Sequence, residues 1–208
     1  MPNTALIIID MQNDFMPGGV LAVPNGNEII DLINQLQLKF DLVIATQDWH
    51  PAIHKSFATN HANQKPFNII DLNGLSQTLW PAHCVQNTSG AELVNNLNKT
   101  KIQKIIHKGT NPNIDSYSAF FDNAHLQKTD LDDYLKLHKI NTVYIAGVAT
   151  DYCAKFSALD AIKLGYKAYL LEDACKGINL QPDDIKNALD EMREVGVKII
   201  ASHKILKN

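Results

Sequence analysis

Short β-branched runs alternate with amphipathic helical patterns along most of this chain, and that alternation restricts the fold more than any other feature. It is typical of a parallel sheet with helices on both faces. The apolar runs predict six strands, at Ala5–Ile9, Leu42–Thr46, Ile102–His107, Thr142–Ala146, Lys167–Leu171 and Val197–Ala201. The periodic segments predict four helices, at Glu28–Phe40, Leu131–His138, Asp151–Leu164 and Asp183–Val195. We therefore expect an α/β fold, a single-domain three-layer sandwich over residues 1–208 with a mostly parallel six-stranded sheet.

Size and charge narrow the classes of partner and compartment. A chain of 208 residues can bury a substantial core, and its net charge of −3 is too small to indicate binding to nucleic acid or to an anionic membrane. No apolar run has the length of a membrane-spanning helix, and the run Ala5–Ile9 is too short for a signal peptide. We expect a cytoplasmic protein whose three cysteines are thiols.

One long segment departs from the alternation. From Asp48 to Gly90 the chain has neither a persuasive strand pattern nor a long helical one. Irregular segments of this length in a compact domain are usually functional or disordered. This segment carries Trp80 and four histidines, which favours a functional role: His50, His54, His61 and His83.

Four chemically complementary side chains follow predicted strands. Asp10, Asp48 and Lys108 come at the ends of the first three, and the fourth leads into Cys153. Ligands of an open parallel sheet bind outside the carboxyl ends of its strands, so these groups are expected on one rim. A carboxylate can take a thiol proton, and a neighbouring ammonium can hold the carboxylate in place. A plain strand-end salt bridge between Asp10 and Lys108 is the competing interpretation.

Cys153 ends the small-residue turn Gly147–Cys153, which leads from a strand into a helix. If Thr150 or Asp151 caps that helix, the thiol lies in its first turn, where free N–H groups favour a thiolate and can hold an oxyanion. A buried cysteine that packs as a small apolar residue is an equal alternative from position alone. Cys84 and Cys175 lack the turn, and we assign both to packing.

The irregular segment also supplies possible metal ligands. Asp48, His50 and His54 bring one oxygen and two imidazoles within seven residues of sequence, and His83 could complete the set. Such ligands suit Zn²⁺, Fe²⁺ or Mn²⁺. We interpret the other five histidines as surface or core residues: His61, His107, His125, His138 and His203.

These motifs together resemble the nicotinamidase (pyrazinamidase) family, within the isochorismatase-like cysteine hydrolases. The resemblance runs from Ile8–Phe15 to Asp173–Gly177, and so covers most of the chain. Its most specific parts are Asp-Trp-His-Pro-x-x-His, starting at Asp48, and Trp-Pro-x-His-Cys, starting at Trp80; superfamily members without metal lack both. Lys108-Gly109 and Gly-Val-Ala-Thr-Asp-Tyr-Cys are shared more widely.

The resemblance implies an isochorismatase-like hydrolase fold and a role for each motif. It implies Asp10, Lys108 and Cys153 as catalytic triad, and a cis peptide before Ala149 that directs the N–H groups of Ala149 and Cys153 at an oxyanion. It further implies one divalent metal ion, Zn²⁺ ahead of Fe²⁺ and Mn²⁺, held by Asp48, His50, His54 and His83. The implied walls of the pyridine pocket are Phe15, Leu21, Trp80, Tyr117 and Tyr152.

The implied reaction converts nicotinamide, and also pyrazinamide, to the acid and ammonia through a thioester, in NAD salvage. The metal is expected to bind the ring nitrogen and orient the amide. Two alternatives stay open: an amidohydrolase of the same superfamily that acts on ureido or carbamoyl substrates, and a non-enzymatic metal or thiol protein. The sequence also leaves open whether the chain forms a homo-oligomer.

Overall fold

Six parallel strands form the central sheet of the computed structural model, which describes residues 3–207. They are β1 (Thr4–Ile9), β2 (Leu42–Asp48), β5 (Lys104–Lys108), β6 (Thr142–Val148), β7 (Lys167–Lys176) and β8 (Lys198–Ile200). Their order is β5-β2-β1-β6-β7-β8, and every neighbouring pair is parallel. The chain therefore builds outward from β1 in one direction and then, from β6, in the other. The order reverses between β1 and β6, where ligands of such sheets bind.

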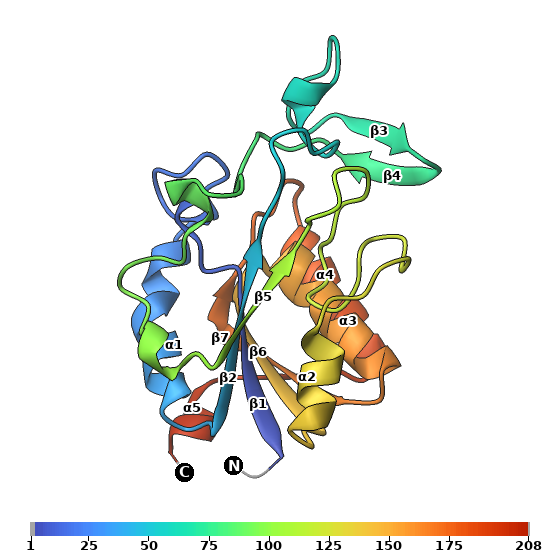
Figure 1. Ribbon diagram of the computed structural model, residues 1–208. Helices are drawn as coiled ribbons and strands as arrows, with labels where there is room; N and C mark the ends of the chain where they lie inside the picture. Colours follow the sequence, from blue (N-terminus) through green and yellow to red (C-terminus); the bar gives the residue numbers. More distant parts are fainter. Residues whose placement is uncertain (1–2, 208) are drawn as a thin grey trace.

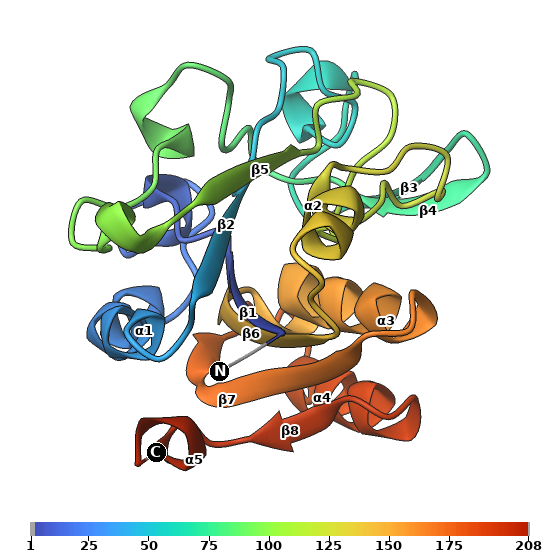
Figure 2. The ribbon, with the colours of Figure 1, turned by 60° about the horizontal axis from the view of Figure 1, so that its bottom comes forward.

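Helices cover both faces of this sheet, as Figure 2 shows in a view toward the amino-terminal ends of the strands. On one face lie α1 (Ile30–Gln37) and α5 (His203–Leu206), and on the other lie α2 (Leu131–Leu137), α3 (Lys155–Lys163) and α4 (Asp184–Glu194). Alternate residues of β1 serve the two faces: Leu6 and Ile8 join the core beneath α1, and Ile7 joins the core beneath α2–α4. Side chains alternate along a strand, so a strand covered on both faces must be apolar throughout.

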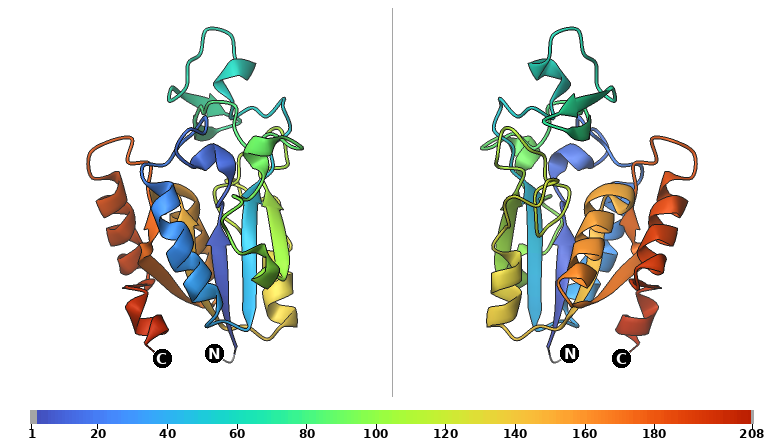
Figure 3. Two further views of the ribbon diagram at one scale, coloured as in Figure 1. Left: turned by 90° about the vertical axis from the view of Figure 1, so that its left-hand side faces the viewer. Right: turned by 90° about the vertical axis from the view of Figure 1, so that its right-hand side faces the viewer.

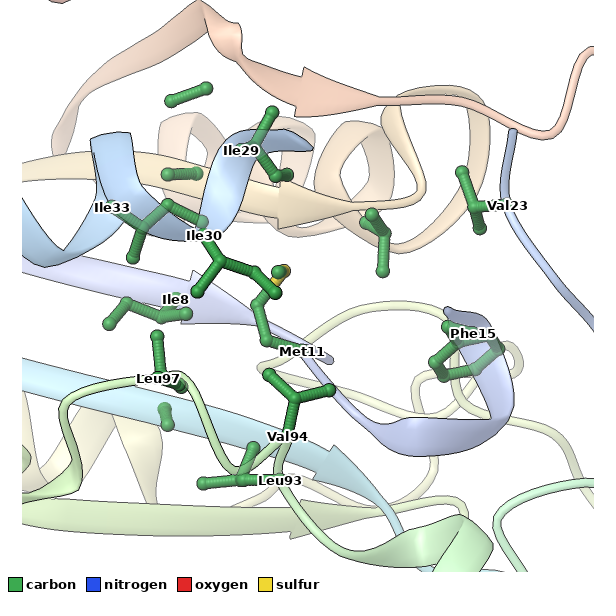
Figure 4. Close-up of a cluster of buried hydrophobic side chains, with 14 of the residues drawn as sticks. Ile8, Met11, Phe15, Val23, Ile29, Ile30, Ile33, Leu93, Val94 and Leu97 are labelled. Carbon is green, nitrogen blue, oxygen red and sulfur yellow. The ribbon is translucent and has the colours of Figure 1, made fainter. Parts of the chain in front are cut away.

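The core beneath α1 continues past the end of β1 (Figure 4). There Met11 and Phe15 pack with Ile8 and with Val94 from the irregular chain between β4 and β5. These side chains are at most 6% exposed, and burying each contributes about 1.5–3 kcal/mol. The packing fixes the chain on both sides of Asp10, the residue that directly follows β1.

A two-stranded hairpin extends beyond the carboxyl end of the sheet (Figures 1 and 3). It pairs β3 (Ile69–Leu72) with β4 (Leu75–Thr78) in antiparallel register through the turn Asn73-Gly74. Both turn residues have positive φ, +57° and +84°, which fits the tight hairpin turn that Asn-Gly favours. The prediction that Asp48–Gly90 contains no strand is wrong at this hairpin, and the Asn-Gly pair was the signal that could have found it.

The other predicted elements are found close to their expected places. All six predicted sheet strands and all four predicted helices are confirmed in position, with shifted ends, while α5 was not predicted. The predicted first helix begins instead as a 3₁₀ turn, Gly26–Ile29. The described residues contain four further 3₁₀ turns: Asn13–Phe15, Ala58–Asn60, Ser89–Ala91 and Lys99–Lys101. Across residues 3–207, no helix combines the length and the apolar character needed to cross a membrane.

The start of the third predicted helix differs from its prediction in a way that matters for Cys153. Residues Thr150–Ala154 form a π-helical turn whose N-cap is Ala149, and no side chain caps it. The prediction that Thr150 or Asp151 is the cap is therefore wrong. The Asp151 carboxylate instead accepts the backbone N–H groups of Ile178 (2.9 Å) and the next residue (2.7 Å). It ties this turn to the loop after β7 rather than to its own helix.

Candidate active site

The Lys108 ammonium lies at the centre of the site, at the end of β5. It contacts Asp10 Oδ2 at 2.9 Å, Asp48 Oδ1 at 2.5 Å and Cys153 Sγ at 3.3 Å. The structure thus brings together all four groups that were predicted to share one rim. Burial alone would lower the pKa of Lys108, but Asp10 and Asp48 raise it well above its usual range. Lys108 is therefore a fixed cation that holds two carboxylates beside a thiol.

Asp10 is held by the neighbouring strand as well as by the lysine. It has a left-handed φ of +47°, its N–H donates to Thr46 Oγ1 (3.1 Å), and the Thr46 hydroxyl donates back to Asp10 Oδ1 (2.5 Å). Burial raises the pKa of the Asp10 carboxyl, while Lys108 and the Thr46 hydrogen bond lower it. A carboxyl with a raised pKa accepts and returns a proton near neutral pH more readily than an ordinary one.

Cys153 lies in the π-helical turn with its side chain buried against Lys108. The peptide between Val148 and Ala149 is cis, as the resemblance implies. Burial raises the pKa of the Cys153 thiol well above its usual range, and the nearby Lys108 offsets this only in part. The expectation that its place at a helix start favours a thiolate is therefore wrong, because burial has the larger effect on this thiol. A thiol in this environment needs a neighbouring base to remove its proton.

Asp48 links this group of residues to a cluster of histidines. Its Oδ2 lies 3.6 Å from His50 Nε2 and 3.7 Å from His83 Nε2, while its Oδ1 contacts Lys108. Burial opposes ionisation, but Lys108 and His50 hold the pKa of Asp48 well below its usual range. Asp48, His50 and His83 therefore offer one carboxylate and two imidazoles within 4.8 Å of one another.

The fourth predicted metal ligand lies beside these three. His54 belongs to an overlapping group with His50 and Asp115, and the rings of His50 and His54 are 4.4 Å apart. His54 Nε2 is buried and has no hydrogen-bond partner among residues 3–207. A buried polar atom without a partner is costly, and a metal ion would satisfy it. Burial, together with His50, lowers the pKa of His54 to about 4, so its imidazole is neutral.

Backbone carbonyls orient the imidazoles of His50 and His83. His50 Nδ1 donates to Gly109 O (2.9 Å), and His83 Nδ1 donates to Pro81 O (2.8 Å). In the neutral imidazole, each Nε2 therefore keeps its lone pair for a ligand, as is usual for metal-binding histidines. Gly109 has a φ of +65°, and a Cβ there would lie 2.3 Å from the His50 ring. These residues fit a divalent cation with nitrogen and oxygen ligands.

A cavity opens between the histidine cluster and Cys153. Its aromatic rings pack edge to face. The ring centroid of Tyr152 lies 5.0 Å from that of Trp80 and 5.4 Å from that of Tyr117. All five wall residues predicted by the resemblance line this cavity, together with Asp48, His83, Ala149 and Cys153: Phe15, Leu21, Trp80, Tyr117 and Tyr152. The arrangement places a thiol and a possible metal site against the same mostly apolar space.

Two lining residues were missed by the sequence analysis, Asp115 and Ile178. Asp115 is 3% exposed and lies in an irregular loop after β5. Ile178 lies just beyond β7, where the Asp151 carboxylate holds its N–H. Neither residue has a periodic pattern or a strand end to mark it. Asp115 could have been suspected as a carboxylate soon after Lys108-Gly109, whereas Ile178 carries no signal in the sequence.

The remaining cysteines and histidines lie outside this constellation. Cys84 and Cys175 are buried free thiols, and burial raises the pKa of Cys84 well above its usual value and that of Cys175 to about 12. Their assignment to packing fits this burial. The five remaining histidines are exposed or half-buried, in line with the surface interpretation: His61, His107, His125, His138 and His203.

Comparison with known proteins gives one consistent picture. The isochorismatase domain model matches residues 4–204. A nicotinamidase of Escherichia coli (strain K12) is 50% identical over 203 residues, 96% of this chain and 95% of that protein. The solved structure of an Acinetobacter baumanii nicotinamidase/pyrazinamidase superposes with a TM-score of 0.96 at 48% identity, covering 99% of both chains.

A third relative is a pyrazinamidase of Pyrococcus horikoshii, solved in complex with zinc. It is 44% identical with a TM-score of 0.77, and the match covers 96% of this chain and 99% of that one. The fold, the site and these matches agree over nearly the whole sequence. The chain therefore belongs to the isochorismatase family, in the branch that contains the nicotinamidases.

Proposed function

We propose that this protein hydrolyses nicotinamide, and also pyrazinamide, to the corresponding acid and ammonia. The observation that carries the proposal is the placement of Cys153, with Asp10 and Lys108 behind it, in an aromatic-walled cavity that also exposes Asp48 and His83. A pyridine ring matches the apolar, aromatic walls, and its amide would lie at the thiol. The names of the relatives support the same substrate class.

In the first half of the reaction, Cys153 Sγ attacks the amide carbon while Asp10 takes the thiol proton. The Lys108 ammonium, 3.3 Å from the sulfur, stabilises the negative charge as it forms. The carbonyl oxygen becomes an oxyanion, to which the N–H groups of Ala149 and Cys153 donate. Asp10 then passes its proton to the amide nitrogen, the C–N bond breaks, ammonia leaves, and a thioester remains on Cys153.

In the second half, water attacks the thioester carbon and Asp10 accepts a proton from it. The C–S bond breaks, the proton returns to the sulfur, and the pyridine carboxylic acid leaves with the water oxygen and loses its remaining proton to solvent. Asp10 thus carries one proton in each half, a task that suits its raised pKa. Lys108 remains protonated throughout and keeps Asp48 anionic.

Asp48, His50, His54 and His83 would hold one divalent metal ion, with Zn²⁺ the first candidate. When bound, the ion supplies a Lewis-acid position for the ring nitrogen, which orients the amide. The buried, unpartnered Nε2 of His54 and the zinc in the Pyrococcus relative support this assignment. We further propose a cytoplasmic location and, because of the substrate, a place in NAD salvage.

The experiment is ammonia release by the purified protein, with its metal content measured in the same preparation. We expect similar kcat/KM for nicotinamide and pyrazinamide, and a value at least about 100-fold lower for benzamide, which lacks the ring nitrogen. A ureido substrate and a carbamoyl substrate test the alternative amidohydrolase. Benzamide turnover equal to that of nicotinamide would contradict the anchoring role. If ammonia is released only from the ureido or the carbamoyl compound, the proposed substrate is wrong and the alternative amidohydrolase is correct.

A further inference from the structure

The strands of the hairpin β3–β4 are exposed or half-buried apart from one residue, and that buried residue is polar. In its two four-residue strands only Gln77 is buried (3% exposed), while Ile69 is 69% exposed. This reverses the usual pattern, in which an isoleucine is buried and a glutamine faces water. An isolated two-stranded hairpin is at best marginally stable in water. The position of the hairpin therefore depends on its contacts with the rest of the molecule. The most buried side chain that its strands provide for such contacts is Gln77.

The Gln77 side chain reaches two residues that line the candidate active-site cavity. Its Nε2 donates to Thr78 O at 2.7 Å, to Asp115 Oδ2 at 3.1 Å and to the Tyr117 hydroxyl at 3.2 Å, so its two N–H groups are shared among three acceptors. The Tyr117 hydroxyl accepts a second hydrogen bond, from Trp80 Nε1 at 3.2 Å. One amide group thus connects the hairpin with a carboxylate and an aromatic wall of the cavity.

The contacts of Asp115 give this connection a consequence for the site. Asp115 Oδ1 already accepts the backbone N–H of Ser116 (2.8 Å), so Gln77 provides the side-chain donor to the other oxygen. Asp115 also has an oxygen within 4.8 Å of ligand atoms of His50 and His54. Without this donor, the buried Asp115 carboxylate would lose one of its hydrogen bonds. Hydrogen bonds in which one partner is charged are among the stronger single interactions in a protein interior.

We propose that Gln77 is a positioning residue for substrate binding, which holds Tyr117 and Asp115 in place and seats the hairpin beside the cavity. This inference rests on the proposed function, because the substrate it positions is the pyridine carboxamide. Gln77 acts through its neighbours, and its described hydrogen bonds end at Thr78, Asp115 and Tyr117, not at Cys153. Its contribution therefore belongs to the affinity for the ring rather than to the chemical step.

The test compares Gln77→Met, which keeps the length of the side chain but removes both N–H donors, with Ser76→Ala. Ser76 is the preceding residue on β4 and is exposed, so it controls for any change in this strand. With nicotinamide, we expect Gln77→Met to raise KM about tenfold or more while kcat stays within about threefold. Ser76→Ala should leave both constants unchanged. An unchanged KM, or a loss confined to kcat, in Gln77→Met would overturn the proposal.

A second measurement does not depend on turnover. Hydrogen exchange of the amides of residues 69–78 should be faster in Gln77→Met than in the wild-type protein, with and without saturating nicotinate. Gln77→Glu, which places a second carboxylate beside Asp115, should show the same change and serves if the methionine variant does not fold. Equal exchange in all variants would show that Gln77 does not seat the hairpin. Absence of ammonia release by the wild-type protein would instead refute the proposed function and leave the exchange result standing.

Discussion

The Thr46 hydroxyl provides a sharp test of Asp10 as the proton carrier. Thr46 is fully buried, donates to Asp10 Oδ1 at 2.5 Å, and lowers the pKa of that carboxyl. Thr46→Val keeps the shape of the side chain but removes this donor, together with the acceptor of the Asp10 N–H. A hydrogen bond to a charged group contributes about 1.5–3 kcal/mol, and one pKa unit corresponds to about 1.4 kcal/mol. The pKa of Asp10 in the variant should therefore rise further, because its ionised form loses this stabilisation.

The sign of the effect on activity follows from the role of Asp10 as a base. Asp10 must be ionised to take the thiol proton, so a higher pKa moves the acid limb of the kcat/KM profile to higher pH. On that limb the variant should be about 10- to 100-fold slower than the wild-type protein, and on the plateau the two should differ by less than about threefold.

The assay is ammonia release from nicotinamide between pH 5 and pH 9, with the metal content of each preparation determined. Thr142→Val is the matched control, because Thr142 is a buried threonine on β6 whose hydroxyl donates to Asn141. Its acid limb should coincide with that of the wild-type protein. An acid limb that does not move in Thr46→Val would refute the assignment of the proton transfer to Asp10.

Three further variants test other parts of the account. Cys153→Ala should abolish turnover with little change in thermal stability, whereas Cys84→Ala should retain catalysis; measurable turnover by Cys153→Ala would exclude a thioester. His83→Ala should bind Zn²⁺ at least about tenfold more weakly in a chelator competition, since loss of even a group that hydrogen-bonds a ligand typically costs about 10- to 100-fold; unchanged affinity would remove His83 from the ligand set. Asp132 accepts hydrogen bonds from Lys136 and Tyr166, which lower its pKa although burial opposes this. Its stabilisation is therefore present above the unfolded-state pKa and is lost as pH falls through the lower folded-state value. Asp132→Asn should lower the free energy of unfolding by about 1 kcal/mol at pH 7, with a difference from wild type that shrinks below about pH 4 in urea titrations; a constant difference would contradict this.

The residues that follow strands could be placed from the sequence because a parallel sheet leaves little choice. Once Ala5–Ile9 and Leu42–Thr46 are recognised as buried parallel strands, Asp10 and Asp48 must emerge at the same edge. Lys108 and Cys153 follow by the same reasoning, and the contacts of Lys108 with the other three agree with it. The pocket walls required the resemblance, since aromatic residues spread from Phe15 to Tyr152 share no spacing.

What the sequence could not supply lies in irregular backbone and in burial. Asp115 lines the cavity from a loop, and Gln77 holds Asp115 from the hairpin, so no periodic pattern marks either residue. The π-helical turn before α3 replaced the expected capped helix start, because Asp151 is used to hold the loop at Ile178. The expectation of a thiolate at Cys153 was wrong because it considered the position in the helix and not the burial that raises the pKa of the thiol.

The central claim is that Cys153 forms a covalent bond to the pyridine carbonyl group. The most direct measurement is mass spectrometry of protein quenched in acid within milliseconds of mixing with saturating nicotinamide, followed by peptide mapping. We predict an adduct with the mass of one pyridine-carbonyl group on the peptide that carries Cys153, which decays as nicotinate appears and is absent from Cys153→Ala. Nicotinate formation in the first turnover with no adduct at any quench time, or an adduct on Cys84 or Cys175 instead, would contradict the account.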